Sequence, residues 1–213
     1  MEDFARPIAR ALGIEKDALP GLEDLARLEI PAPDGPHRRL MRRPREEAVI
    51  GLLRAVRGER YEALVHLLLD SGARIADALR ALDNLGRAVE VRPGIYKVPV
   101  GRIRGPKRCL WVYLTAETLE MLKRMPKPPS YNAINLWRRK HGLPHLKLLR
   151  KFCFTAMRRA GIYPEVARYI QGRVQGVSEE CYEDLELLAD EQYPLYAEYV
   201  RSLKARAQAS DTE

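Results

Sequence analysis

The chain has 213 residues, of which 46% are apolar and 31% are charged, so it can bury one substantial core and carry an extension. Lys and Arg number 37 against 29 Asp and Glu, and the net charge of +8 favours a polyanionic partner. No apolar run approaches the roughly 18 residues of a membrane span, and Met1-Glu2-Asp3-Phe4 has no signal-peptide character. These features argue against a membrane partner.

The three cysteines are odd in number and lack metal-ligand spacing. They therefore favour a reduced, cytoplasmic protein without a metal site, and no pattern in the chain calls for a cofactor.

The first 45 residues differ from the rest and are expected to form an N-terminal extension and linker. A proline-rich break covers residues 30–36, and a basic run that includes Arg42 and Arg43 follows it. We interpret this run as a linker along a phosphate backbone, or else as a solvated basic loop. The main domain is expected over residues 46–207, with a polar tail over 208–213.

Helical and extended patterns succeed each other along this domain. Three helices are predicted first, with the third opening at Arg74, and three short strands with turn signals between them follow. The remaining segments again have a helical period. We therefore predict a mainly α protein with a small antiparallel β-sheet. The expected helices are 46–57, 61–69, one from residue 74, 115–123, 130–140, 144–160, 164–171, 178–189 and 194–207, and the expected strands are 88–91, 95–98 and 110–114.

The charge is unevenly distributed along the second half of the chain. Residues 138–173 contain ten Lys and Arg and one acid, Glu165, whereas residues 174–200 contain eight acids and no Lys or Arg. Such segregation is not needed for solubility alone. It predicts one DNA-facing segment, followed by a segment that a phosphate backbone would repel.

Several cationic side chains precede one tyrosine at separated positions. Guanidinium groups bind phosphate oxygens in bidentate fashion, and a tyrosine hydroxyl can attack phosphorus to form a covalent intermediate. This combination suits a phosphodiester substrate. The candidate catalytic residues are Arg74, Lys107, Lys147, Arg150, Arg173 and Tyr182.

Three of the motifs that contain these residues resemble those of tyrosine recombinases. Gly72-Ala73-Arg74-Ile75-Ala76-Asp77 resembles the helix start that carries the first arginine of that family. Lys147-Leu148-Leu149-Arg150 resembles the His-x-x-Arg box with lysine in place of histidine. Gly172-Arg173, followed by Tyr182, resembles the ending of the family with arginine in place of the second histidine. Both departures are similar to integrases of archaeal viruses and plasmids, and the resemblance covers residues 45–205.

The resemblance implies a role for each residue. Arg74, Arg150 and Arg173 would hold the phosphate, and Tyr182 would be the nucleophile. A lysine of the β-hairpin would protonate the leaving 5′ oxygen; Lys107 is preferred, although Lys97, Arg102, Arg104 and Arg108 are near it in sequence. Two plainer interpretations remain open: Arg74 could simply pair with Asp77, and Lys147 and Arg150 could belong to a generic basic helix.

The implied activity is site-specific DNA recombination through a 3′-phosphotyrosine, by protomers that are monomeric when free and form a tetramer on double-stranded DNA. A chromosome-dimer-resolving recombinase and a non-catalytic DNA-binding protein of the same fold are the alternatives. The residues expected to contact DNA are Arg42, Arg43, Arg104, Arg108, Arg138, Arg139, Lys140 and Lys151.

The segment after Tyr182 carries Tyr193, Tyr196 and Tyr199 at a spacing of three residues. By resemblance, the last helix would dock on a neighbouring protomer, and these tyrosines could supply the apolar stripe. Alternatively, the helix folds back on its own core.

Overall fold

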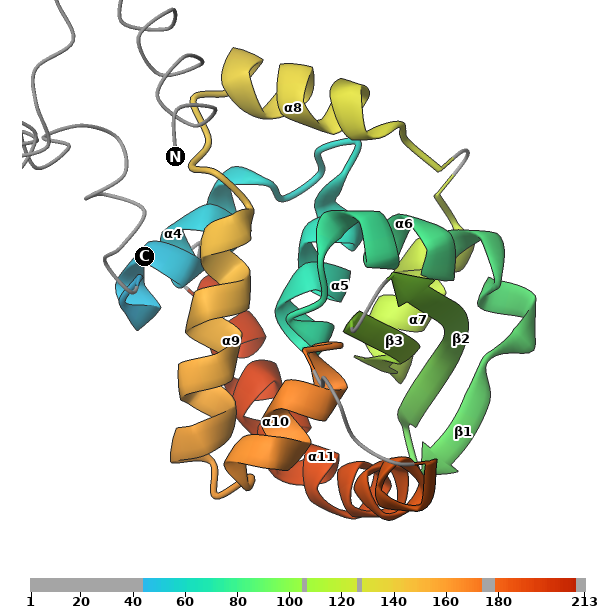
Figure 1. Ribbon diagram of the computed structural model, residues 1–213. Helices are drawn as coiled ribbons and strands as arrows, with labels where there is room; N and C mark the ends of the chain where they lie inside the picture. Colours follow the sequence, from blue (N-terminus) through green and yellow to red (C-terminus); the bar gives the residue numbers. More distant parts are fainter. Residues whose placement is uncertain (1–43, 105–106, 126–127, 174–178, 210–213) are drawn as a thin grey trace, which may run out of the picture. The chain divides into compact units, whose positions relative to one another are not determined.

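The computed structural model describes residues 44–104, 107–125, 128–173 and 179–209. This part of the chain contains eight α-helices and one three-stranded antiparallel sheet, which confirms the predicted mainly α fold with a small sheet (Figure 1). The expected extension over residues 1–45 and the tail over 208–213 lie almost wholly outside the described residues, so that division of the chain stays a prediction. Within the described part, no helix is long and apolar enough to cross a membrane.

Helix α5 is the centre of the helical half. It spans Glu62–Ser71, and nearly all its side chains are buried, including the polar ones of His66, Asp70 and Ser71. It ends at Gly72, which has a left-handed backbone with a φ of 59°. A Cβ there would collide with the side chains of Gln171 and Cys153, so only glycine fits this turn. The two neighbouring helices are α4 (Glu46–Ala55) and α6 (Ile75–Asp83).

The sheet has the order β1-β2-β3 and packs against α5, α6 and α7. The pairing of β2 with β3 continues to Arg104 opposite Lys107, well beyond the short runs predicted from sequence. The register is irregular between Pro99 and Arg102, and most of the paired residues beyond it are basic, so the apolar pattern did not reveal the full length of the two strands. The strands are β1 (Val89–Arg92), β2 (Ile95–Arg104) and β3 (Lys107–Thr115), and a short 3₁₀ turn, η2 (Leu85–Arg87), precedes β1.

The later helices largely follow the sequence pattern. Ser130 caps α8 as predicted, since its Oγ accepts a hydrogen bond from the Ala133 amide at 3.2 Å. Thr115 directly precedes α7, the helix before α8. Its hydroxyl forms hydrogen bonds with Asp70 and Thr118 and does not cap α7. The helices are α7 (Ala116–Lys123), α8 (Tyr131–Lys140), α9 (Lys147–Arg159), α10 (Pro164–Ile170) and α11 (Glu179–Gln208).

The prediction of two helices at the C-terminal end is wrong, because α11 is one helix of 30 residues with Pro194 inside it. A proline in a helix interior costs roughly 3 kcal/mol, which is why the sequence suggested a break. Tyr193 and Tyr196, on either side of it, are wholly buried, as are Val200 and Leu203 farther along. Burial of these side chains outweighs the local cost of the proline.

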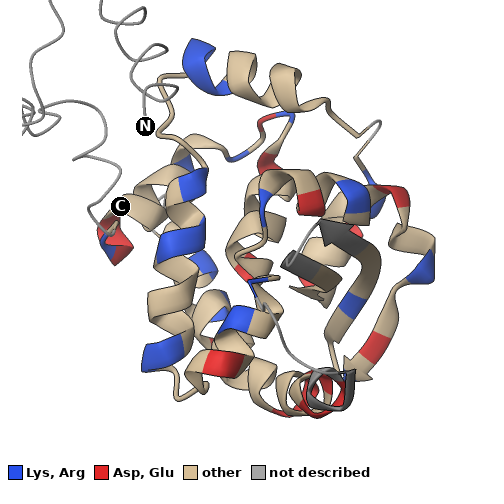
Figure 2. Cartoon of the chain, viewed as in Figure 1, with Lys and Arg blue, Asp and Glu red and all other residues tan. Residues whose placement is uncertain are grey.

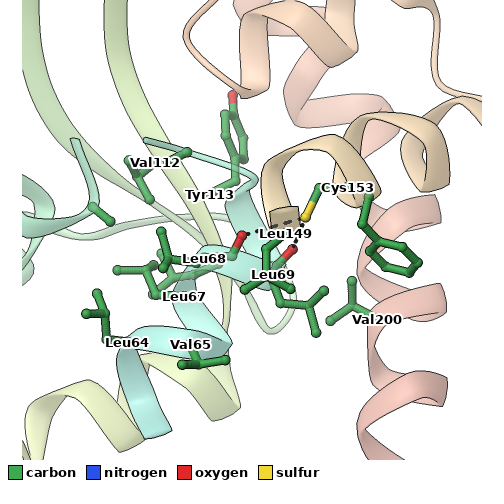
Figure 3. Close-up of a cluster of buried hydrophobic side chains, with 14 of the residues drawn as sticks. Leu64, Val65, Leu67, Leu68, Leu69, Val112, Tyr113, Leu149, Cys153 and Val200 are labelled. Carbon is green, nitrogen blue, oxygen red and sulfur yellow. Dashed lines mark hydrogen bonds between the residues drawn. The ribbon is translucent and has the colours of Figure 1, made fainter. Parts of the chain in front are cut away.

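Helix α11 lies against the chain's own core. The hydroxyl groups of Tyr193 and Tyr196 donate hydrogen bonds to the carbonyls of Asp70 and Leu69, at 3.1 and 2.7 Å. Figure 3 shows the neighbouring cluster, in which α5 packs between Cys153 of α9 and the sheet. The structure therefore has the second of the two arrangements considered for this helix, in which the tyrosines form part of the core rather than an exposed stripe.

Candidate functional site

Three arginines that are far apart in sequence meet where α5, α9 and α10 approach each other. Arg74 precedes α6, Arg150 lies on α9, and Arg173 follows α10. Arg74 Nη1 donates a hydrogen bond to the Gly172 carbonyl at 2.6 Å, whereas Arg150 Nη1 donates to the carbonyls of Gly72 and Gln171 at 2.8 and 2.6 Å. Arg150 thus fixes the turn before Arg74, and Arg74 fixes the turn before Arg173.

Two glycines make this interlocking possible. Gly72 and Gly172 both have left-handed backbones, with φ of 59° and 64°. A Cβ at Gly172 would lie 2.7 Å from the Cβ of Cys109, so a larger residue would displace β3. Gln171, between the two turns, returns a hydrogen bond from its Nε2 to the Arg150 carbonyl at 2.9 Å. The backbone that holds the arginines is therefore fixed from both sides.

The three guanidinium groups repel one another. Burial and, after it, the positive charges of Arg173 and Arg74 together lower the pKa of Arg150 to about 9. Burial and Arg74 likewise lower the pKa of Arg173, whose guanidinium carbon lies 5.6 Å from the ring centre of Phe154. The three guanidinium groups therefore concentrate positive charge in a partly buried place.

Arg74 also contacts Asp77, as one of the plainer interpretations suggested. The distance from Arg74 Nη1 to Asp77 Oδ2 is 3.4 Å, which is long for a charged hydrogen bond. The Asp77 side chain is almost wholly buried, whereas about a third of the Arg74 side chain is exposed. Asp77 can thus orient Arg74 without covering it.

One nitrogen of this cluster lacks a partner. Arg150 Nη2 is buried and makes no hydrogen bond to any described residue. A buried, charged donor without an acceptor costs free energy, and an anion with several oxygens would satisfy it. The arrangement can therefore bind an anion such as a phosphate.

Lys147 is the first residue of α9, one turn before Arg150, and its side chain is exposed. Its amide donates a hydrogen bond to Nδ1 of His145 at 3.2 Å. Burial lowers the pKa of His145, as do the charges of Arg138 and Lys147. This histidine, for which the sequence suggested no role, therefore orders the start of the helix that carries two candidate residues.

Lys107 and Tyr182 are placed only through their backbones. Lys107 begins β3 at the end of the long hairpin, and Tyr182 lies in the first turn of α11. Their side chains lie outside the described residues, so the proposed roles of both stay predictions.

Lys97, the other lysine near the hairpin, is already engaged. Its Nζ lies 2.6 Å from Glu186 Oε1 and 2.7 Å from Asp190 Oδ2, and its side chain is buried. No local pattern signals this pairing, because the partners lie 89 and 93 residues away in a segment whose acids suggest an exposed surface.

The residues expected to contact DNA differ in their exposure and in their contacts with the rest of the chain. Arg139 and Lys140 are exposed at the end of α8, and Lys151 is half-buried on α9. Arg138 instead donates a hydrogen bond from Nη1 to the Leu143 carbonyl at 2.8 Å, so at least part of its guanidinium orders the loop after α8. Basic residues recur along α9, whereas acids gather at the beginning of α11 (Figure 2). Arg42, Arg43 and the side chains of Arg104 and Arg108 lie outside the described residues.

Among the described residues, no group of three or more His, Cys, Asp or Glu could hold a metal ion. The site is defined by the three cationic side chains of Arg74, Arg150 and Arg173.

Comparison with protein families identifies the chain more closely. The model of the archaeal phage integrase family matches residues 43–199, which is well over half of the chain, so the chain belongs to this family. Comparison with curated proteins gave no match. Membership places the chain among integrases, which act on DNA.

Proposed function

We propose that the chain is a tyrosine-type site-specific DNA recombinase that integrates or excises a mobile element. The observation that carries the proposal is the convergence of Arg74, Arg150 and Arg173, with one buried guanidinium nitrogen left without an acceptor. A scissile phosphate would supply that acceptor. Fixed donors placed where negative charge develops are an effective way to stabilise a phosphorane-like transition state.

In this mechanism, the Tyr182 hydroxyl oxygen attacks phosphorus and forms a phosphotyrosine with the 3′ phosphate. The bond from phosphorus to the 5′ oxygen of the next nucleotide breaks, and that oxygen takes a proton from Lys107. The tyrosine proton passes to solvent, because Lys147 is a poor base at neutral pH. A 5′-hydroxyl from a partner duplex then reverses these steps and rejoins the strand.

Lys107 is preferred to Lys97 as the general acid on geometric grounds. Lys97 is buried between two carboxylates, and moving its ammonium to a DNA phosphate would leave both without their cation. Lys107 lies near the tip of the hairpin, where a lysine can reach a bound duplex.

The proposal also includes the assembly of four protomers on DNA.

The decisive experiment is covalent trapping on a nicked suicide substrate, a duplex from which the cleaved 5′ fragment diffuses away. The wild-type chain should accumulate a protein–DNA adduct that resists denaturation. Tyr182→Phe should form none while it keeps its DNA affinity, because the ring stays and only the attacking oxygen is lost. An adduct formed by Tyr182→Phe would refute the nucleophile assignment. Absence of any adduct with the wild type would favour a non-catalytic DNA-binding protein.

The arginine cluster has its own test. Arg150→Ala should lower the rate of adduct formation by roughly 10²–10³, the loss expected for one charge-stabilising donor. Arg158→Ala is the matched control, because Arg158 is exposed on the same helix and is not part of the cluster. Thermal melting of both variants would show whether loss of the bonds to Gly72 and Gln171 unfolds the chain. Near-normal cleavage by a folded Arg150→Ala variant would remove this arginine from the mechanism.

A further inference from the structure

A fully paired polar cluster joins the first half of α11 to the sheet and to α10. Glu186 and Asp190 lie one turn apart on α11, and both accept hydrogen bonds from Lys97 of β2, at 2.6 and 2.7 Å. Three further donors come from Trp111 and Tyr113 of β3 and from Tyr169 of α10. The cluster, called the clasp below, consists of Lys97, Trp111, Tyr113, Tyr169, Glu186 and Asp190.

Each carboxylate oxygen of the clasp has a donor. Glu186 Oε2 accepts from Trp111 Nε1 at 2.8 Å and from the Tyr169 hydroxyl at 3.1 Å, and its other oxygen faces Lys97. Asp190 Oδ1 accepts from the Tyr113 hydroxyl at 2.6 Å. A partly buried network in which each carboxylate oxygen has a donor favours one arrangement, because any slip or rotation of the helix leaves charged atoms unpaired.

The clasp is adjacent, along the chain, to both parts of the proposed site. Tyr182 precedes Glu186 by one helical turn of α11. On the other side, the carbonyl of Tyr169 accepts a hydrogen bond from the Gly172 amide at 2.8 Å, and the carbonyl of Gly172 holds Arg74. One cluster therefore fixes the helix of the proposed nucleophile and the turn that supports the arginines.

We propose that Lys97, Glu186 and Asp190 are positioning residues for DNA cleavage, which fix the start of α11 relative to the arginine cluster. This inference rests on the proposed function in one respect, the role of Tyr182. The anchoring of α11 can be measured without DNA, so failure of one proposal is distinguishable from failure of the other.

The first test removes hydroxyl groups and keeps the rings. The double variant Tyr113→Phe/Tyr169→Phe takes one donor from each carboxylate of the clasp. Tyr199→Phe is the matched control, because the Tyr199 hydroxyl also donates to a carboxylate, that of Glu46 on α4, at 2.7 Å. Hydrogen exchange should accelerate roughly tenfold at amides 183–190 in the double variant, as expected for two lost hydrogen bonds, but not at amides 196–206.

The second test measures cleavage on the suicide substrate. Lys97→Met should lower the adduct rate by about 10²-fold with little change in DNA affinity, since small misplacements of reacting groups have effects of this size. Lys97→Arg, which keeps the cation, should restore much of the rate. If Lys97→Met does not fold, the double tyrosine variant carries this test, with an expected loss of roughly tenfold.

Equal exchange in the double variant and in Tyr199→Phe would overturn the clasp as an anchor. Faster exchange at amides 183–190 with an unchanged adduct rate would overturn its role in positioning. Faster exchange in a chain whose wild type forms no adduct would support the anchor and refute the proposed function instead.

Discussion

The two ends of helix α11 are held by different forces. Its second half is held largely by apolar burial, since Tyr196, Val200 and Leu203 are wholly inaccessible to solvent. Its first half is held by the clasp, whose acidic side chains stay partly exposed, about 30% for Glu186. Apolar burial is strong but not directional, whereas charged hydrogen bonds demand one geometry. The second half of α11 thus stabilises the fold, and the clasp fixes the position of the start of the helix.

Each end of α11 has a lysine paired with a carboxylate, and the two pairs differ in how far they are buried. Lys204 Nζ lies 2.9 Å from Asp70 Oδ1, and both side chains are almost wholly buried. Burial raises the pKa of Asp70, but Lys204 and the hydrogen bond from the Thr115 amide outweigh this and hold it below its usual value. In the clasp, the carboxylates keep contact with water. Loss of one partner should therefore cost more stability at the buried end.

The largest effect is expected from removing the buried end. Deleting residues 192–213 takes away the large, wholly buried side chains of Tyr193, Tyr196, Val200 and Leu203, each worth about 1.5–3 kcal/mol, and their sum rivals the total stability of a domain. The truncated chain should fail to fold, as judged by circular dichroism. Deletion of residues 210–213 is the control and should melt like the wild type. A cooperative melt for the longer deletion would mean that α11 is not part of the core.

Lys204→Met should come next, with a loss of about 3–5 kcal/mol, because it leaves the Asp70 carboxylate buried without a cation. Urea denaturation would measure this loss. Lys204→Met/Asp70→Asn should recover part of it, since the charge is then removed from both sides. If the single variant loses less than about 1 kcal/mol, the pair is not as well buried as the contrast between the two ends requires.

Acid should weaken the buried end through His66, which lies near Lys204 and Asp70. Burial and Lys204 lower its pKa to about 4, from 6.5. The unfolded chain then binds the proton first as pH falls, so stability decreases between pH 6.5 and 4. The loss from pH 7 to pH 5 should be about 2 kcal/mol, and His66→Gln should abolish it. Urea denaturation of the wild type and of His66→Gln at the two pH values would measure this loss of stability. An equal loss in both proteins would show that His66 is not its cause.

The smallest effect is expected from Tyr199→Phe, which removes one hydrogen bond to Glu46 and should cost about 1 kcal/mol. Its adduct rate should equal that of the wild type, because the bond lies outside the clasp. A marked loss of cleavage in this variant would show that α11 transmits disturbances along its length, and that its two ends are not independent.

The sequence alone determined what depends on local chemistry. Helical periods and turn residues predicted most of the element order, including the helix expected over residues 130–140, but not the continuity of α11. The resemblance of the motifs around Arg74, Arg150 and Arg173 to those of tyrosine recombinases implied that the three arginines share a site. The structure brings these three together, while their catalytic roles, like those of Lys107 and Tyr182, stay predictions.

Only the tertiary structure decided which side chains meet across long separations. Pro194 lies inside a continuous helix because core packing on both sides of it outweighs its local cost. Lys97 was an alternative to Lys107 as the lysine of the hairpin, yet it lies between two carboxylates that are 89 and 93 residues away in sequence. The residues next to a cationic side chain in sequence do not indicate which acceptor it will contact. Burial and the distance to the nearest acceptor set its role, and both arise only when distant elements pack together.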